Sequence, residues 1–334
     1  MKSFSANFFD KSNFIISVKK FLEARKQDES SIVHICYNVN NDYFFVLGAS
    51  IISVLENNPE LVFAVHIFTD GCSKDNENKI AELAKKWKCN CYIYTLNMIP
   101  FKDFHIKVKR FSRITYARLI MPKILYPNVL RYIYIDADAI VIKSILPLEK
   151  WNLKGAAMAA VSDTPDSVIR RGGFLKLKSG KYFNDGIMVV DVNNWEKLHI
   201  TEKAFSYQGE NPKRFIGQSQ DVLNLVFDGT NCFLPDIYNC FAGYSNNPNA
   251  TIIHWTGRRK PWQMILNKFD KKWRHYNELS PWKTITNIRP IKKAENYHDF
   301  QQWGRYQKKQ GNLWEYLYGI FWYALLRIKF KLHV

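Results

Sequence analysis

The sequence predicts an α/β protein with one mostly parallel central sheet flanked by helices. Short apolar runs alternate with segments of helical spacing between about residues 32 and 255, and this alternation is typical of a parallel sheet covered on both faces. The chain has 334 residues, of which 47% are hydrophobic and 15% aromatic, a composition that excludes a disordered protein. This length allows one large α/β domain with an appendage.

The first third of the chain supplies the opening strands and helices. We expect residues 1–30 to form an N-terminal preface with a short helix over 14–25. A central domain over 31–270 then begins with an apolar strand (32–37) and a buried helix (43–57), which the polar run Asn57-Asn58 before Pro59 ends. A β-rich run (63–69) stops at the turn Asp70-Gly71. A helix over 74–87 with one apolar face and a strand over 91–96 follow.

The alternation continues to about residue 255. A helix is expected over 115–124, with Pro122 near its end, and a strand over 131–135 that stops at Asp136. Further strands are expected over 156–161, 186–190 and 252–255. Ser219 is expected to be the N-cap of a helix over 220–227. From about residue 271 the chain becomes basic and aromatic, so we expect residues 271–334 to form a separate helical region.

The charge of the chain points to an anionic partner. Lys and Arg number 48 against 30 Asp and Glu, a net charge of +18, and such a balance favours nucleic acid, nucleotide, phospholipid or phosphorylated glycan. Residues 255–334 hold 17 of the basic and only 5 of the acidic side chains. The six cysteines form no Cys-x-x-Cys pair, and we expect reduced thiols in a cytosolic protein without a secretory signal or a membrane span.

The sequence lacks several motifs that mark well-known binding and catalytic sites. It contains no Gly-x-Gly-x-x-Gly dinucleotide loop, no P-loop, no His-Glu-x-x-His and no Gly-x-Ser-x-Gly. The strongest signal is instead Asp136-Ala137-Asp138, which follows the apolar strand over 131–135. Carboxylates at a strand end suit a hard divalent cation, which can in turn bridge a diphosphate. The two acids could also simply mark a strand-to-turn junction.

A second group of residues follows the strand over 252–255. It begins at His254, which can add a third metal ligand, and mixed oxygen and nitrogen ligation favours Mn²⁺ over Mg²⁺. In the same segment Gly257 lets the backbone approach a phosphate closely and Lys260 offers it a positive charge. Taken alone, His254 would be interpreted as a core histidine.

Together these motifs resemble those of the family 8 retaining glycosyltransferases, in particular the bacterial lipopolysaccharide core α-glucosyl- and α-galactosyltransferases. The resemblance rests on Thr115-Tyr116-Ala117-Arg118, on Asp136-Ala137-Asp138 and on the segment from His254 to Trp262, in that order. The segments 182–186 and 220–224 look like the sugar-side segments of the family. The resemblance covers residues 32–262 and implies a GT-A-like domain that binds a UDP-sugar.

The resemblance also implies a role for each matching residue. Asp136, Asp138 and His254 would ligate Mn²⁺, with Mg²⁺ as an alternative. Nucleotide-sugar contacts would come from Asn38, Asn40, Tyr43, Arg118, Ala137, Gly257 and Lys260. Of these, Tyr43 would stack on the uracil, and Gly257 and Lys260 would hold the diphosphate. Catalytic contacts would come from Arg118, Asn184, Gln220 and Asp221.

The sequence departs from the family pattern at three positions. Asn40 stands where the family usually has Asp, although an amide can still both donate and accept hydrogen bonds. Ser219 replaces a frequent Asp before Gln220, which leaves the donor sugar open between glucose and galactose. Asp185 replaces a residue that is commonly small and apolar, and it either touches the acceptor or is a solvated loop carboxylate.

The expected reaction is α-transfer of glucose or galactose from a UDP-sugar to the lipopolysaccharide core, with retention. Gln220 is a neutral amide and a poor nucleophile, so we favour front-face attack, in which the leaving diphosphate takes the acceptor's proton. The alternative is a protein without catalysis that binds nucleic acid or acts as a membrane-surface scaffold. We favour the enzyme, without a nucleic-acid partner, on the cytoplasmic face of the inner membrane. Its amphipathic end, residues 313–331, is expected to dock on anionic lipid.

Overall fold

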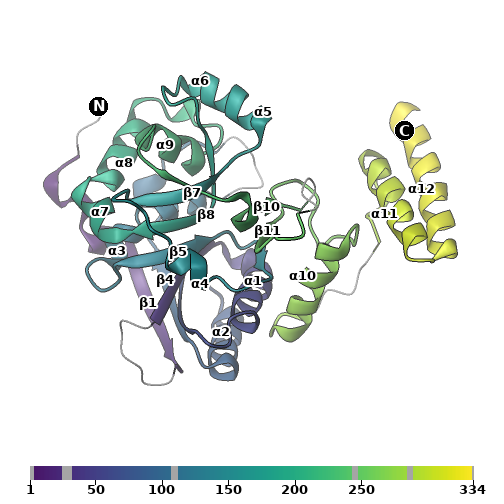
Figure 1. Cartoon of the computed structure of the whole chain (residues 1–334), viewed down its shortest axis with the longest axis horizontal. Coiled ribbons are helices and arrows are strands. Elements are labelled where there is room, and N and C mark those ends of the chain that lie inside the picture. The colour runs from purple at the N-terminus through teal and green to yellow at the C-terminus, as the bar shows by residue number, and fades with distance from the viewer. Residues whose placement is uncertain (1–3, 25–31, 107–111, 243–246, 284–288, 333–334) are drawn as a thin grey trace.

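The computed structural model describes residues 4–24, 32–106, 112–242, 247–283 and 289–332. Its centre is an eight-stranded sheet with the strand order β1-β4-β3-β2-β5-β8-β7-β9 (Figure 1). The neighbours β2–β3, β3–β4, β2–β5 and β7–β9 run parallel, and β1–β4, β5–β8 and β7–β8 run antiparallel. The strands are β1 (Ile15–Leu22), β2 (Ile32–Val39), β3 (Val62–Thr69), β4 (Asn90–Leu96), β5 (Arg131–Ile135), β7 (Met158–Ser162), β8 (Phe183–Asp191) and β9 (Cys232–Leu234). The predicted α/β fold with a mostly parallel sheet is confirmed.

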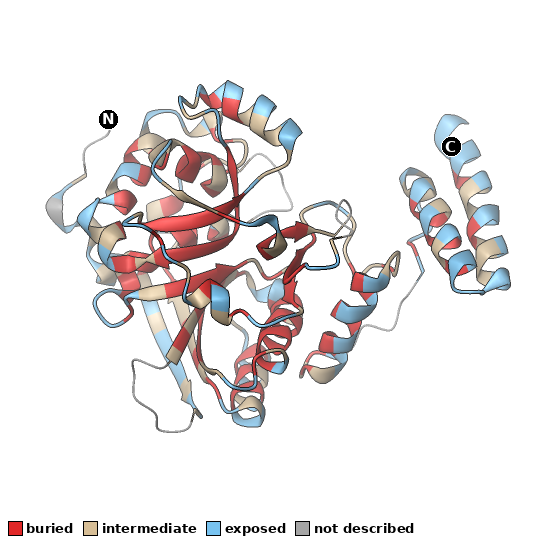
Figure 2. Cartoon of the chain, in the orientation of Figure 1, coloured by how far each residue is buried: buried red, intermediate tan, exposed pale blue. Residues whose placement is uncertain are grey.

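Helices cover both faces of this sheet. The α-helices of the described residues are α1 (Phe44–Glu56), α2 (Lys74–Trp87), α3 (Met121–Leu125), α4 (Leu146–Glu149), α5 (Pro165–Ser167), α6 (Gly173–Leu175), α7 (Val192–Lys197), α8 (Ile200–Glu210), α9 (Ser219–Val226), α10 (Lys268–Leu279), α11 (Tyr297–Lys309) and α12 (Leu313–Leu332). Of these, α11 and α12 lie away from the sheet, beyond α10 (Figure 1). In β5, Ile133 and Ile135 face the core beneath α1 and α10, whereas Tyr132 and Tyr134 face the core beneath α3, α8 and α9. Both sets are fully buried (Figure 2), so the strand is apolar on both faces.

A small second sheet brings two distant segments together. It has the order β10-β11-β6, with β6 (Ala139–Val141), β10 (Cys240–Phe241) and β11 (Ile252–His254). The strands β11 and β6 are antiparallel, and His254 lies opposite Ala139. This register places His254 beside Asp138, which directly precedes β6.

The helix predicted over 14–25 is wrong, because this segment forms the edge strand β1. Its backbone pairs with β4 from Ile15 to Leu22. The residues that precede it also pack on the sheet: Phe8 and Phe9 lie against the buried Phe14 and Phe205. Pairing with the exposed edge of β4 outweighs the weak helical spacing of the segment.

Two helix starts also differ from the prediction. Residues 113–119 form a 3₁₀ helix (Arg113–Leu119), and Pro122 lies in the first turn of α3 rather than at a helix end, where its missing N–H costs nothing. The N-cap of α9 is Gln218, with a positive φ of 57°, and not Ser219. The Ser219 hydroxyl instead donates to Asp185 Oδ2 at 2.8 Å.

The predicted boundary near residue 270 falls inside α10. This helix packs on α1, and Trp273, Tyr276 and Trp282 belong to the core that α1 closes. The Trp282 ring lies directly against Gly48 of α1, where a side chain would not fit. The aromatic residues up to Trp282 therefore complete the core of the α/β domain.

Helices α11 and α12 form an antiparallel hairpin beside α10 (Figure 1), and α12 confirms the predicted terminal helix. Gly304 and Gly319 let the two helices approach closely: a Cβ added to Gly319 would lie 2.7 Å from Gly304 Cα. The hairpin still leaves apolar side chains of α12 exposed, among them Trp314 at 84% and Phe321 at 60%. Within the described residues, none of the helices has the length and apolarity needed to cross a bilayer.

A buried imidazole and a half-buried one in the sheet predict a loss of stability in mild acid. His34 Nδ1 lies 2.9 Å from His66 Nε2, and burial lowers the pKa of His34 to about 4 and that of His66 well below its usual value. The unfolded chain therefore binds protons between pH 6.5 and about 4 that the folded chain does not, so stability falls as the pH falls. Urea unfolding at pH 7 and pH 5 should show a loss about 2 kcal/mol larger for the wild type than for His34→Gln. Equal losses would contradict this assignment.

Candidate active site

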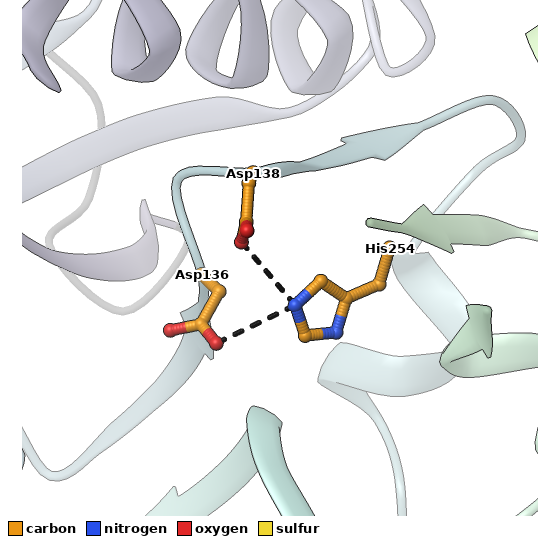
Figure 3. A group of neighbouring side chains, drawn as sticks. All are labelled: Asp136, Asp138 and His254. Carbon is orange, nitrogen blue, oxygen red and sulfur yellow. Dashed lines mark ion pairs between the residues drawn. The ribbon is translucent and has the colours of Figure 1, made fainter. Parts of the chain in front are cut away.

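Three potential metal ligands meet where β5 and β11 end. Asp136 and Asp138 follow β5, and His254 ends β11 (Figure 3). His254 Nε2 lies 3.5 Å from Asp136 Oδ2 and 3.2 Å from Asp138 Oδ1, and one ligand atom from each residue lies within 4.8 Å of the others. The structure thus brings together the three residues that the sequence predicts as metal ligands.

A chain of amides orients the His254 ring. The Gly186 N–H donates to Asn184 Oδ1 at 3.0 Å, which fixes this atom as the oxygen of the amide. The same oxygen lies 2.8 Å from Asn239 Nδ2, so the other end of the Asn239 amide is its oxygen. That oxygen lies 2.9 Å from His254 Nδ1, and Nδ1 must therefore carry the proton. The lone pair of Nε2 then points toward the two aspartates, as a metal ligand requires.

The donor set fits a divalent cation. Two carboxylates and an imidazole lone pair that face one another repel unless a positive charge lies among them. Oxygen with nitrogen ligation suits Mn²⁺ and also accepts Mg²⁺. Burial alone would raise the pKa of Asp138, but the Lys260 ammonium, 2.6 Å from Asp138 Oδ2, holds this pKa below its usual range. Asp138 is therefore ionised at neutral pH.

Arg118 lies buried between two carboxylates. Its guanidinium contacts Asp136 Oδ1 at 2.9 Å and Asp185 Oδ2 at 2.7 Å, and it donates to the Tyr134 hydroxyl at 2.8 Å. Burial disfavours the charged guanidinium, yet Asp185, Tyr134 and Asp136 together raise the pKa of Arg118. Asp185 is only 6% exposed, so it is not a solvated loop carboxylate. Its pKa is raised by burial and partly restored by Arg118.

Gln220 is held on both sides of its amide. Gln220 Oε1 accepts from Asn184 Nδ2 at 3.0 Å, and Gln220 Nε2 donates to Asp163 Oδ2 at 2.8 Å. Asn184 thereby links Gln220 to the Asn239–His254 pair. Gln220 and the metal triad are thus parts of one hydrogen-bonded network.

These residues surround one cavity of about 530 Å³. Of the predicted site residues, its walls include Asn38, Asn40, Tyr43, Arg118, Asp136, Ala137, Asp138, Asn184, Gln220, His254 and Lys260. Gly257 and Asp221 are not part of this lining. Asp221 is fully buried, forms an ion pair with Arg171 and accepts hydrogen bonds from the Tyr182 hydroxyl and the Gly217 N–H, both at 2.7 Å.

The predicted nucleoside loop forms one rim of the cavity. Asn40 Oδ1 accepts from the Tyr43 N–H at 3.2 Å, which shapes the turn before α1. The Tyr43 ring stands edge-on to Trp262, with centroids 6.1 Å apart. Trp262 also lines the cavity, so aromatic surface from two distant segments flanks this rim.

Sequence reasoning missed Asp163, Asn239 and Tyr134 as members of the site. Asp163 follows β7 directly, so its position at a strand end was a signal that could have identified it. Tyr134 lies inside β5 and looks like a core aromatic residue, although its hydroxyl donates to Asp136 Oδ1 at 2.6 Å. Asn239 lies in a connecting segment before β10, where no local pattern marks it.

The amide chain predicts that Asn239 controls metal affinity. Asn239→Leu should weaken Mn²⁺ binding about 10- to 100-fold, because the imidazole loses the acceptor that fixes its tautomer. Asn239→Asp keeps an oxygen for Nδ1–H and should bind Mn²⁺ within a few-fold of the wild type. Titration of Mn²⁺ followed by electron paramagnetic resonance measures both. Unchanged affinity in Asn239→Leu would show that the ring needs no such partner.

Comparison with known proteins agrees with this geometry. Residues 34–265 match the family described as glycosyl transferase family 8. The chain is 27% identical over 303 residues to a lipopolysaccharide 1,2-glucosyltransferase of Escherichia coli, covering 85% of this chain and 89% of the relative. It is 26% identical to a lipopolysaccharide 1,3-galactosyltransferase of Salmonella typhimurium, covering 74% and 81%.

A solved structure has the same fold. The galactosyltransferase LgtC, in complex with donor and acceptor sugar analogues, aligns with a TM-score of 0.68 at 20% identity. The alignment covers 76% of this chain and 98% of that one. The α/β domain described above therefore has the predicted GT-A-like fold.

Proposed function

This chain belongs to glycosyl transferase family 8, and from that premise we propose that it is a metal-dependent, retaining hexosyltransferase. It moves glucose or galactose from a UDP-sugar to the lipopolysaccharide core with an α linkage. The observation that supports this most is the joining of the Asp136, Asp138 and His254 triad to Gln220 and Asn184 at one cavity. A binding protein would need neither the oriented imidazole nor the two carboxylates that face it.

The donor half of the cavity is proposed to bind the nucleotide. Asp136, Asp138 and His254 would hold Mn²⁺, or Mg²⁺, which neutralises charge on a diphosphate. Lys260, now paired with Asp138, would share its charge with that diphosphate, next to the Gly257 backbone. The nucleoside would be contacted by Asn38, Asn40 and Tyr43, with Ala137 beside them.

The sugar half is proposed to orient the hexose. Arg118 would contact the donor sugar from between Asp136 and Asp185, and Asn184 and Gln220 would lie along the sugar near its anomeric carbon. Asp221 is buried away from the cavity lining, so we propose that it positions Gln220 by anchoring Arg171 and the Gly217 N–H. With Gln220 neutral and Asp185 paired to Arg118, we retain front-face attack as the proposed route.

This route predicts that Gln220 is helpful but dispensable. Gln220→Ala should lower the transfer rate about 10- to 100-fold, the worth of one or two positioning hydrogen bonds, and the product should keep the α configuration. Product anomers are read by NMR, and urea unfolding confirms the fold. A folded, inactive Gln220→Ala with a sugar trapped covalently on Asp221 or Asp185 would instead support double displacement.

The donor and acceptor follow from the relatives and remain proposals. The two relatives described above are a glucosyltransferase and a galactosyltransferase of lipopolysaccharide, so both UDP-glucose and UDP-galactose are candidate donors. Their names also differ in linkage position. The shared acceptor class is the reason for proposing the lipopolysaccharide core here.

We also propose that the hairpin of α11 and α12 docks on the anionic cytoplasmic face of the inner membrane. Trp314, Leu317, Phe321 and Ile328 are exposed along α12, at spacings that place them on one side of a helix. Basic residues lie at its end, including Arg327, Lys329 and Lys331. An apolar row with nearby cations is typical of helices that lie in the membrane interface. We therefore propose two parts of the chain, the α/β domain up to about Lys283 and the membrane-docking hairpin of α11 and α12.

A UDP-release assay tests whether the chain is an enzyme at all. With Mn²⁺ and UDP-glucose or UDP-galactose, slow hydrolysis should release UDP even without an acceptor. A nucleic-acid binder or a membrane scaffold without catalysis would release none. Those two alternatives would also leave Asp138→Ala indistinguishable from the wild type.

A further inference from the structure

A second cavity lies next to the active site. It has a volume of about 700 Å³ and is bounded by the loop before α10, by α10 and by α11. Lys260 lines both this cavity and the catalytic one, so the two cavities adjoin at this side chain. We call it the basic groove, after its lining residues Arg259, Lys260, Lys268, Arg305 and Lys309.

The acidic residue of the groove does not offset these charges at its surface. Asp270 is 4% exposed and its carboxylate accepts from the Trp255 indole at 2.8 Å and from two backbone N–H groups, of Leu266 at 2.7 Å and of Asn267 at 3.0 Å. Its oxygens therefore point into the protein. The groove presents a net positive charge to whatever enters it.

Three of the cations are available for a ligand. Arg259 is already paired with Asp299 and Lys260 with Asp138, whereas Lys268, Arg305 and Lys309 form no ion pair with any of the residues the structure describes. Arg305 and Lys309 are four residues apart on α11, a spacing at which like charges repel. An anion in the groove would remove this repulsion.

The other lining groups suit a phosphorylated sugar. Gln302, Gln310 and Asn267 offer amide N–H groups, since their oxygens already accept from Arg259, Lys271 and the first turn of α10, and Tyr306 offers a ring. Hydroxyl-rich ligands use such amides and rings, and a phosphate ester, with about two negative charges, matches the three unpaired cations. A neutral sugar would gain nothing from them.

We propose that the basic groove binds a phosphate group carried by the acceptor glycan. The proposal rests on the proposed function, since it deepens the acceptor class of that site. The phosphate would hold the acceptor at a fixed distance from Lys260, so that a hydroxyl of a neighbouring sugar faces the donor cavity. Phosphorylation of the acceptor would then determine which glycans are used.

Calorimetry with the full-length protein tests this with the donor site filled by Mn²⁺ and UDP. The probes are a phosphorylated core oligosaccharide and the same oligosaccharide after phosphatase treatment. The wild type should bind the phosphorylated form at least about tenfold more tightly. Arg305→Gln/Lys309→Gln should lose this preference. The control Lys272→Gln/Lys293→Gln removes the same charge from exposed residues outside the groove and should keep it.

The proposal would be overturned if the wild type bound the two oligosaccharides equally or bound neither. It would also be overturned if the control variant lost the preference. A third contrary result would be weaker binding of the groove variant than of the wild type to vesicles of anionic phospholipid alone. The last result would assign the groove to lipid headgroups. This result can be told apart from a failure of the proposed function. A chain that releases no UDP from UDP-sugars could still prefer the phosphorylated oligosaccharide, and a chain that releases UDP could lack that preference.

Discussion

Asp138→Ala is expected to lower hexose transfer to less than about a thousandth of the wild-type rate while the protein remains folded. The variant removes one of the three proposed metal ligands and leaves Lys260 without its carboxylate partner. A cation held by Asp136, Asp138 and His254 would supply positive charge to the departing diphosphate, so its loss would raise the barrier by several kcal/mol. His254→Ala should behave in the same way, because it removes the nitrogen ligand.

A matched control variant distinguishes the effect of losing a proposed metal ligand from the effect of losing any carboxylate. Asp236→Ala changes an exposed carboxylate at the start of the 3₁₀ helix Asp236–Tyr238 and should leave transfer unchanged. Transfer, UDP release and urea unfolding are measured for all three variants with Mn²⁺ present. If folded Asp138→Ala keeps more than a tenth of the wild-type rate, Asp138 is not a metal ligand.

Ending the chain after Lys283 is expected to abolish binding to anionic vesicles and to leave UDP-sugar hydrolysis largely intact. The cut removes α11 and α12 but keeps Trp282, which the core needs. A cut at the predicted boundary of 270 would instead remove Trp273 and most of α10. About five engaged cations at about 1 kcal/mol each account for a reversible attachment in the sub-millimolar range, before any apolar insertion.

A point variant tests the same surface without shortening the chain. Trp314→Ser/Leu317→Ser/Phe321→Ser should weaken vesicle binding, whereas Ile16→Ser/Ile99→Ser/Ile169→Ser, which removes equally exposed apolar residues elsewhere, should not. Added salt should release the wild type in part, because it screens the charges. Full-length protein that ignores anionic vesicles at low salt would refute docking.

Much of the fold could be predicted because buried strands and one-sided helices leave periodic patterns. The helix over 74–87 and the strand over 131–135 were predicted with the bounds that α2 and β5 have. The edge strand β1 could not be, because its pairing with β4 depends on residues some seventy positions away. The sequence also did not show that α10 belongs to the α/β domain. Its basic residues suggested an exposed helix, whereas its aromatic face packs on α1, which is distant in the sequence.

The sequence identifies the residues of the proposed metal triad and many residues of the cavity wall, but it does not show how they are arranged in space. The sequence places Asp136 and His254 at strand ends, and only the β11–β6 register shows that they meet. The sequence does not distinguish between an acceptor contact and a solvated carboxylate for Asp185, because the ion pair of Asp185 with Arg118 is a long-range contact without a local pattern. The same holds for Asn239, whose importance follows from one hydrogen bond to His254.

The most direct test of the proposed function is transfer of labelled hexose to lipopolysaccharide from a set of truncated-core strains. UDP-glucose and UDP-galactose are offered in turn, with Mn²⁺ and with a chelator. We predict that one donor labels one truncated core, with an α linkage by NMR, and that the chelator stops the reaction. No labelling of any core by either donor, from protein that releases UDP from the same donors, would contradict the proposed acceptor.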